Sequence, residues 1–268
     1  MIDILQFEFM QNALLSSLLV SIICGIIGTL IVINRMVFIA GGLAHGSYGG
    51  VGLALYLGIA PMLGATLFAL TLSFVIALLA YKNSSRIDAI IGALWAFGMA
   101  FGIILSDLTP GYNVDLMSYL FGAILSVSSE DLMHIGIVLT LVCLFVCFYY
   151  QQLVAMSFDM EFAKLRGVPT RALYFILVAL IALCVVVTIR AVGLILVIAL
   201  LSIPPYIAEK FTHSIAGMMA FSTLLSALFS LSGIFLSYMY DLSSGATIIA
   251  VATTVFFMQL LSEKVFKY

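Results

Sequence analysis

Charged residues are scarce in this sequence. Lys and Arg number 10 and Asp and Glu number 12 among 268 residues, so 8% of the chain is charged while 65% is hydrophobic. A soluble domain of this length needs far more charge to cover its surface, which excludes that class. No cluster of basic residues is present, so nucleic acid is excluded as a partner. The composition indicates a protein that lies in membrane lipid.

Two other features are missing. The chain lacks the G-x-x-x-x-G-K-[ST] motif with which P-loop proteins hold nucleotide phosphates, so it is not expected to hydrolyse ATP itself. It also lacks a C-x-x-C pair, and its four cysteines lie inside apolar segments, where we predict buried small hydrophobic residues. The four-residue spacing of Cys143 and Cys147 leaves a metal pair as the alternative. The other two cysteines are Cys24 and Cys184.

Apolar segments of about 20 residues, long enough to cross a bilayer as helices, recur along the whole chain. We predict an all-α polytopic membrane bundle of eight or nine transmembrane helices, forming a single transmembrane domain over residues 1–268. No stretch remains for a separate soluble domain. The nine candidate spans are 12–33, 36–57, 61–81, 87–107, 131–150, 171–189, 192–208, 214–239 and 246–263.

The basic residues predict the orientation of the chain. If the N-terminus is outside, nine of the ten Lys and Arg residues fall at cytoplasmic ends of the spans, as the positive-inside rule requires. The C-terminus is then cytoplasmic. The exception is Arg190, whose long side chain is expected to reach the outer interface. The other nine are Arg35, Lys82, Arg86, Lys164, Arg166, Arg171, Lys210, Lys264 and Lys267.

The predicted second span, MVFIAGGLAHGSYGGVGLALYLG, is rich in glycine and contains no Asp, Glu, Lys or Arg. Gly42, Gly46 and Gly50 are four residues apart, which puts them on one stripe of a helix. Small residues on such a stripe let another helix pack closely against it. His45 lies near the middle of this segment.

An ionisable side chain at this depth in a membrane is by default a functional candidate. We therefore predict that His45 is a transient ligand for an ion in transit, with the hydroxyl of Tyr48 as a second candidate ligand. The alternative is a packed histidine whose ring bonds a backbone carbonyl or the region of Ser47. A weak site suits conduction, because the ion must also leave.

The predicted outer loop, residues 107–131, is acidic and contains Asp115. This carboxylate is a candidate ligand for an incoming cation. The alternative, which we favour, is that Asp115 caps a short helix within the apolar segment 119–127. Asp immediately before a helix is a common N-terminal signal.

The predicted inner loop, residues 155–171, reads AMSFDMEFAKLRGVPTR. Asp159 is expected to cap a short helix over 160–165, which Gly167 and Pro169 end. Phe158, Phe162 and Leu165 then form its apolar face. One interpretation is a solvated linker. We favour a docking helix that enters a groove on a soluble partner, because a linker needs no apolar face.

Two interruptions mark the later spans. The sequence Arg190-Ala191-Val192-Gly193 divides a long apolar region into two shorter helices, and Pro204-Pro205 distorts the cytoplasmic end of the second. Interrupted helices mark transport pathways in some transporters. They are equally often ordinary helix ends, and both interpretations remain open here.

Several stretches together resemble the membrane permease subunits of bacterial ATP-binding-cassette importers for zinc, manganese and iron, the metal ABC-3 transporter family. The resemblance implies a type II ABC importer-like permease in the bacterial plasma membrane. It also implies a second copy of the chain as partner, two ABC ATPase subunits inside and an extracytoplasmic metal-binding protein. The stretches, in chain order, are RMVFIAGGLAHGSYGGVGLA, YNVDLMSYLFGAILSVSSEDL, SFDMEFAKLRGVPTRAL, AVGLILVIALLSIPP and DLSSGATIIAV.

The resemblance also implies roles for particular residues. His45 matches the family's pathway histidine, and the inner loop matches the coupling helix that sits on the ATPase. Family members often carry an acidic residue four positions before the histidine, where this chain has Gly41. An imidazole alone is a weaker metal site than an imidazole with a carboxylate. The coupling residues implied are Phe158, Asp159, Glu161, Phe162, Lys164 and Gly167.

The sequence therefore predicts the permease subunit of an ATP-driven importer of divalent transition metal ions. The ion is the transported substrate, no resident cofactor is expected, and ATP is held by the partner subunit. The alternative is a secondary transporter driven by an ion gradient, which inverted repeats and mid-membrane carboxylates would support; neither is visible. A membrane enzyme would need a cluster of reactive groups, whereas His45, His134 and His213 lie on separate spans.

Overall fold

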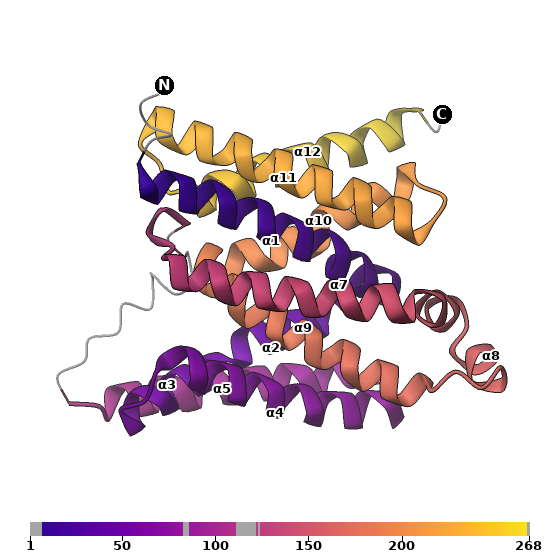
Figure 1. Cartoon of the computed structure of the whole chain (residues 1–268), viewed down its shortest axis with the longest axis horizontal. Helices are drawn as coiled ribbons and strands as arrows, with labels where there is room; N and C mark the ends of the chain where they lie inside the picture. Colours follow the sequence, from indigo (N-terminus) through magenta and orange to yellow (C-terminus); the bar gives the residue numbers. More distant parts are fainter. Residues whose placement is uncertain (1–6, 83–85, 111–121, 123, 267–268) are drawn as a thin grey trace. The chain divides into compact units, whose positions relative to one another are not determined.

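The computed structural model of the chain describes residues 7–82, 86–110, 122 and 124–266 (Figure 1). These described residues form helices and short connections, with no β-strand among them. The elements are α1 (Glu8–Ile33), α2 (Val37–Gly46), α3 (Tyr48–Leu57), α4 (Pro61–Lys82), α5 (Ile87–Asp107), η2 (Ile124–Ser126), α7 (Ser129–Phe158), α8 (Met160–Leu165), α9 (Thr170–Val192), α10 (Leu194–Phe211), α11 (Ile215–Tyr240) and α12 (Ser244–Phe266).

Eight described helices are long and apolar enough to cross a membrane: α1, α4, α5, α7, α9, α10, α11 and α12. The prediction of an all-α bundle with eight or nine spans is confirmed. The predicted second span differs in detail, because the helix is interrupted at Ser47 and forms α2 and α3, each of ten residues. Ser47 keeps right-handed helical angles, φ −60° and ψ −20°, and its N–H still donates to the Leu43 oxygen at 3.0 Å.

The chain divides into two compact units. Unit 1 comprises residues 1–33, 117–140 and 187–268, and unit 2 comprises 34–116 and 141–186. The long helices α7 and α9 each begin in one unit and end in the other. Each unit therefore combines segments that are far apart in the sequence.

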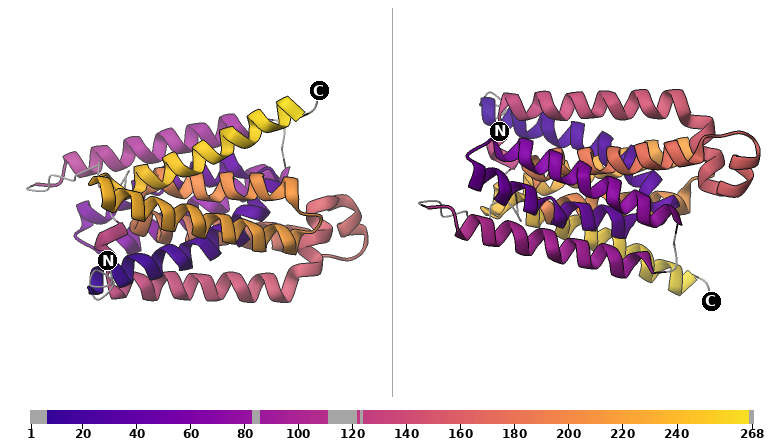
Figure 2. Two further views of the ribbon diagram at one scale, coloured as in Figure 1. Left: turned by 90° about the horizontal axis from the view of Figure 1, so that it is seen from above. Right: turned by 90° about the horizontal axis from the view of Figure 1, so that it is seen from below.

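Within unit 1, α1 packs against α10 and α11, and α11 packs against α12 (Figure 2). Small residues permit this close packing, as they do between membrane helices generally. A Cβ on Gly25 would overlap Thr223 of α11, and a Cβ on Gly28 would lie 2.7 Å from the backbone oxygen of Leu201 on α10. Serine side chains are buried on both α1 and α11: Ser16, Ser17, Ser21, Ser222, Ser226 and Ser230.

The predicted interruption after Arg190 is confirmed. α9 ends at Val192 and α10 begins at Leu194, with Gly193 between them at φ +87°, a left-handed angle that favours glycine. The two prolines lie inside α10 and not at its end, since the helix continues to Phe211. Pro204 and Pro205 are both buried.

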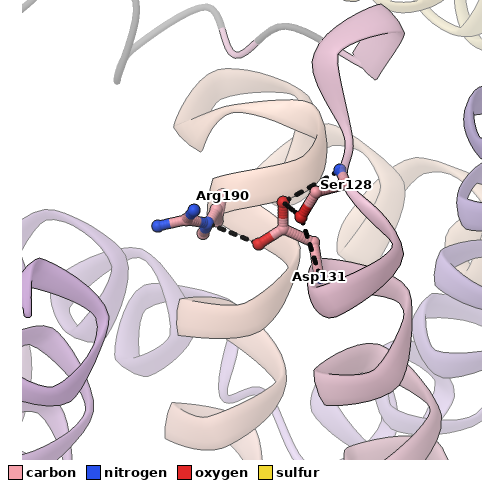
Figure 3. A network of polar contacts seen from close by, with 3 residues as sticks. All are labelled: Ser128, Asp131 and Arg190. Atoms are coloured by element: carbon pink, nitrogen blue, oxygen red, sulfur yellow. Dashed lines mark hydrogen bonds and ion pairs between the residues drawn. The ribbon is translucent and has the colours of Figure 1, made fainter. Parts of the chain in front are cut away.

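Arg190 pairs with a carboxylate at the start of α7 (Figure 3). Its Nε donates to Asp131 Oδ1, and the same carboxylate accepts from the hydroxyl of Ser128 at 2.8 Å. The Ser128 hydroxyl in turn accepts from the Asp131 backbone N–H at 3.2 Å, and Asp131 Oδ2 accepts from the Ser128 backbone N–H at 3.1 Å, which is the reciprocal arrangement of a capping box. The sequence predicts Arg190 at an interface, but no local pattern indicates this partner.

Within unit 2, α3 packs against α4 and α5, and α2 also contacts both (Figures 1 and 2). The glycine positions bring backbones into contact. A Cβ on Gly50 would overlap the Gly64 oxygen of α4, and one on Gly52 would overlap Gly102 of α5. The predicted stripe of small residues does allow close packing, but it faces two helices and not one, because its member Gly42 lies against Ile91 of α5.

The structure differs from the sequence-based predictions in two details. α7 extends to Phe158, past the predicted end at residue 150, and continues through a non-helical residue, Tyr149 (φ −113°, ψ 16°). The cysteines are not all buried: Cys24 and Cys184 are, whereas Cys147 is exposed on the helix surface. An exposed thiol on a membrane-spanning helix faces lipid or another helix, so burial by the chain's own fold is not required.

Candidate functional site

His45 lies in the last turn of α2, and its ring stacks on the indole of Trp95 in α5. The ring centroids are 4.0 Å apart and the ring planes differ by 14°. The indole is itself fixed, because its N–H donates to the sulfur of Met99 at 3.1 Å, one helical turn further along α5. The imidazole therefore has a flat aromatic neighbour over one of its faces.

The Nδ1 atom of His45 is buried and has no hydrogen-bond partner among the described residues. One expected alternative was a bond from the ring to the region of Ser47. The Ser47 hydroxyl donates instead to the Ala44 oxygen at 2.7 Å. Since a buried polar atom without a partner is costly, this nitrogen is a position where a ligand would be stabilising.

Tyr48 begins α3 and is 2% exposed. It packs against Gly102, where an added Cβ would lie 2.7 Å from the tyrosine ring. Trp95 and Gly102 are both on α5, seven residues apart, which corresponds to about 10 Å along a helix axis. His45 and Tyr48 thus face the same helix at levels two turns apart. The third predicted ligand, Asp115, lies outside the described residues.

One turn before His45, the surface of α2 leaves room for a side chain. A Cβ on Gly41, one turn earlier, would meet no atom within 4 Å. Among the described residues, no three His, Cys, Asp or Glu side chains are grouped so that they could hold a metal ion. A single copy of the described chain therefore offers one imidazole and no multidentate metal site at this position.

The predicted inner helix is present as α8, beyond the adjoining ends of α7 and α9 (Figure 1). Asp159 is its N-cap, with extended backbone angles, and its carboxylate accepts from the Phe162 N–H at 3.0 Å. At the other end the Gly167 N–H donates to the Lys164 oxygen and the Val168 N–H to the Ala163 oxygen. This pair of bonds is a Schellman motif, which needs the positive φ that Gly167 adopts at +80°.

The apolar residues around α8 point to solvent. Phe158 is 79% exposed, Phe162 50% and Leu165 87%. The guanidinium of Arg166 lies over the Phe162 ring, 5.1 Å from its centroid. Glu161 and Lys164 are also exposed. Exposed large apolar side chains gathered in so short a segment mark a contact surface for another molecule.

An open pocket of about 730 Å³ adjoins α8 on the side of α9. Lys164 and Arg171 give it a basic character, and the ring of Phe175 lies 5.7 Å from the Arg171 guanidinium. Thr170, at the start of α9, lies on its wall and is buried. Beside the apolar side chains, this end of unit 2 therefore offers positive charge to a partner.

Trp95 is the site residue that the sequence analysis missed. The chain contains a single tryptophan, which was a signal that could have singled it out. Its position opposite His45 depends on how α2 and α5 pack, and no local pattern around residue 95 indicates that.

These helices define a polytopic helical membrane protein. A family model described as ABC 3 transport family matches residues 6–263, so the chain belongs to that family, whose members are permeases of metal ABC transporters. This assignment confirms the resemblance seen in the sequence and does not favour the gradient-driven alternative.

The chain is similar to proteins of known and unknown function. It is 48% identical to an uncharacterized membrane protein of Synechocystis sp., over 97% of this chain and 92% of that protein. It is 32% identical to the manganese transport system membrane protein MntC of Halalkalibacterium halodurans, over 95% and 87%. The solved structure of PsaBC from Streptococcus pneumoniae in complex with Fab matches with a TM-score of 0.85 and 31% identity, over 96% and 93%.

Proposed function

We propose that this chain is the membrane-spanning subunit of an ATP-driven importer of divalent transition metal ions, with manganese as the leading substrate. Two copies, two ABC ATPase subunits and an extracytoplasmic metal-binding protein complete the transporter. Both units of the chain act as one permease domain in the plasma membrane, with the N-terminus outside and the C-terminus cytoplasmic. The similarity to a manganese transport protein supports the choice of metal.

The observation that carries the proposal is the exposed apolar face of α8. Phe162 and Leu165 lie on a helix that is capped at both ends, and the exposed Phe158, which the sequence placed on the same face, is the last residue of α7 just before the cap. A short helix of this kind inserts into a groove on a partner and transmits its motion. The groove belongs to the ATPase, and Asp159, Glu161, Lys164 and Gly167 shape and orient the helix.

His45 is proposed as the transient ligand of the ion in transit. Its unpartnered Nδ1 and the absence of a multidentate site in the described residues fit an ion that binds weakly and leaves. Two copies of the chain supply two imidazoles. Tyr48 and Asp115 are the secondary candidates.

The test is metal uptake by vesicles that contain the complete transporter. His45→Ala should reduce Mn²⁺ uptake to the background of vesicles without permease, while two permease copies still assemble with the ATPase. Competition by Zn²⁺ and Fe²⁺ in the same assay ranks the substrates. Full Mn²⁺ uptake by the His45→Ala transporter would remove this residue from the mechanism.

A further inference from the structure

We propose that Trp95 is a positioning residue for His45: its indole face holds the imidazole flat, and it stabilises the imidazole more strongly when the ring carries a metal ion. This inference rests on the proposed role of His45 as a ligand. It assigns a function to the only tryptophan in the chain.

Close contacts between α2 and α5 flank the stack on both sides. A Cβ on Gly42, one turn before His45, would overlap Ile91, which lies one turn before Trp95. A Cβ on Gly98, just after Trp95, would lie 2.6 Å from the oxygen of Gly46. α2 and α5 are therefore closely packed on either side of the stack.

The indole is fixed independently of His45. Its N–H is bonded to the Met99 sulfur, and the ring of Phe38 on α2 lies 6.3 Å from the indole centroid at an angle of 56°. His45 and Phe38 are seven residues apart, so α2 places two aromatic side chains against one indole. The imidazole therefore meets a surface that is already oriented.

The charge of the imidazole decides how strongly it stacks. The face of an indole carries negative electrostatic potential and attracts positive charge, more strongly than the faces of the other aromatic side chains. A metal ion bound to a ring nitrogen withdraws electrons and makes the imidazole positive. The indole therefore favours the metal-bound state over the free state, and Trp95 raises metal affinity without touching the ion.

The lone tryptophan also provides the measurement. The full-length permease in lipid nanodiscs is titrated with Mn²⁺ while tryptophan emission is recorded, with Trp95→Phe as the blank. We expect a saturable change in emission in the unaltered chain and none in His45→Gln. The unaltered chain and His45→Gln both keep Trp95, so comparing them is informative even where a Trp95 variant fails to fold. A saturable change that persists in His45→Gln would overturn the inference.

The second measurement is the Mn²⁺ affinity of each variant, determined by equilibrium dialysis. Trp95→Leu is expected to weaken binding roughly twofold to thirtyfold, the range that a cation–π contact spans, and Trp95→Phe less. Phe97→Leu, on the same helix but 59% exposed, is the matched control and should bind like the unaltered chain.

The two proposals fail in different ways. Unchanged binding by Trp95→Leu, together with lost binding by His45→Gln, would leave His45 as the ligand and remove Trp95 from the site. Unchanged binding by His45→Gln would remove His45 itself.

Discussion

The two functional regions of unit 2 are built differently. α8 comes from one continuous segment, Asp159 to Val168, closed by its own caps, and it exposes its apolar residues. The His45–Trp95 stack joins two helices whose residues are fifty positions apart, and one of its ring nitrogens is buried. The first arrangement suits contact with a large soluble partner. The second suits a small ion that needs a nitrogen and little space.

Charge placed on α8 should have the largest effect. Phe162→Glu with Leu165→Glu puts two carboxylates on the face proposed to enter the ATPase. Loss of central apolar contacts typically costs 2 kcal/mol or more, so we expect roughly thirtyfold weaker association with the ATPase. Co-purification and a binding titration measure it. Gln151→Glu, an exposed position on α7, is the control and should associate normally.

The proposed metal site at His45 can be altered without affecting α8. Gly41→Asp places a carboxylate one turn before His45, where an added Cβ meets open space. A second, charged ligand should tighten Mn²⁺ binding by roughly tenfold, since a carboxylate attracts the ion strongly at partly buried depth. Equilibrium dialysis measures the change, and Gly41→Asn controls for shape. Equal affinity of the two variants would mean that position 41 does not face the ion.

Two glycine substitutions on α5 test the close helix packing beside the stack. Gly98→Ala brings a Cβ within 2.6 Å of a backbone oxygen of α2, and overpacking of this kind costs about 1–3 kcal/mol. Gly92→Ala on the same helix meets no atom within 4 Å and should stabilise the protein by up to about 1 kcal/mol, since alanine is the better helix former. Unfolding in mixed detergent measures both. The same sign for both changes would contradict the packing described.

The smallest effects are expected at Asp131, where a local and a long-range contact share one carboxylate. Ser128→Ala removes the helix cap and should cost about 1 kcal/mol of unfolding free energy. Arg190→Gln removes the ion pair, and its side chain is 51% exposed, so the cost should be below about 1 kcal/mol. Double-mutant cycles with Asp131→Asn separate the two contributions. A larger cost for Arg190→Gln would assign the ion pair a role beyond capping.

The same division between local and long-range contacts explains what the sequence could predict. The bounds of α8, its Asp159 cap and its Gly167 end were predicted correctly because each signal lies within ten residues. The break at Gly193 and the apolar spans could also be predicted from local sequence. The partner of Arg190 and the stacking of Trp95 on His45 were not predictable, because they depend on which helices meet. The glycines of α2 and α3 indicated close packing, but not that two helices take part.

The central claim is that this chain conducts metal ions only when an ATPase acts on α8. The most direct measurement is Mn²⁺ accumulation in sealed vesicles that hold either the purified chain alone or the chain with its ATPase, its extracytoplasmic metal-binding protein and ATP. We predict accumulation above the external concentration only in the second case, and its loss with Phe162→Glu and Leu165→Glu. Accumulation against the gradient by the chain alone, without nucleotide or a second protein, would contradict the account.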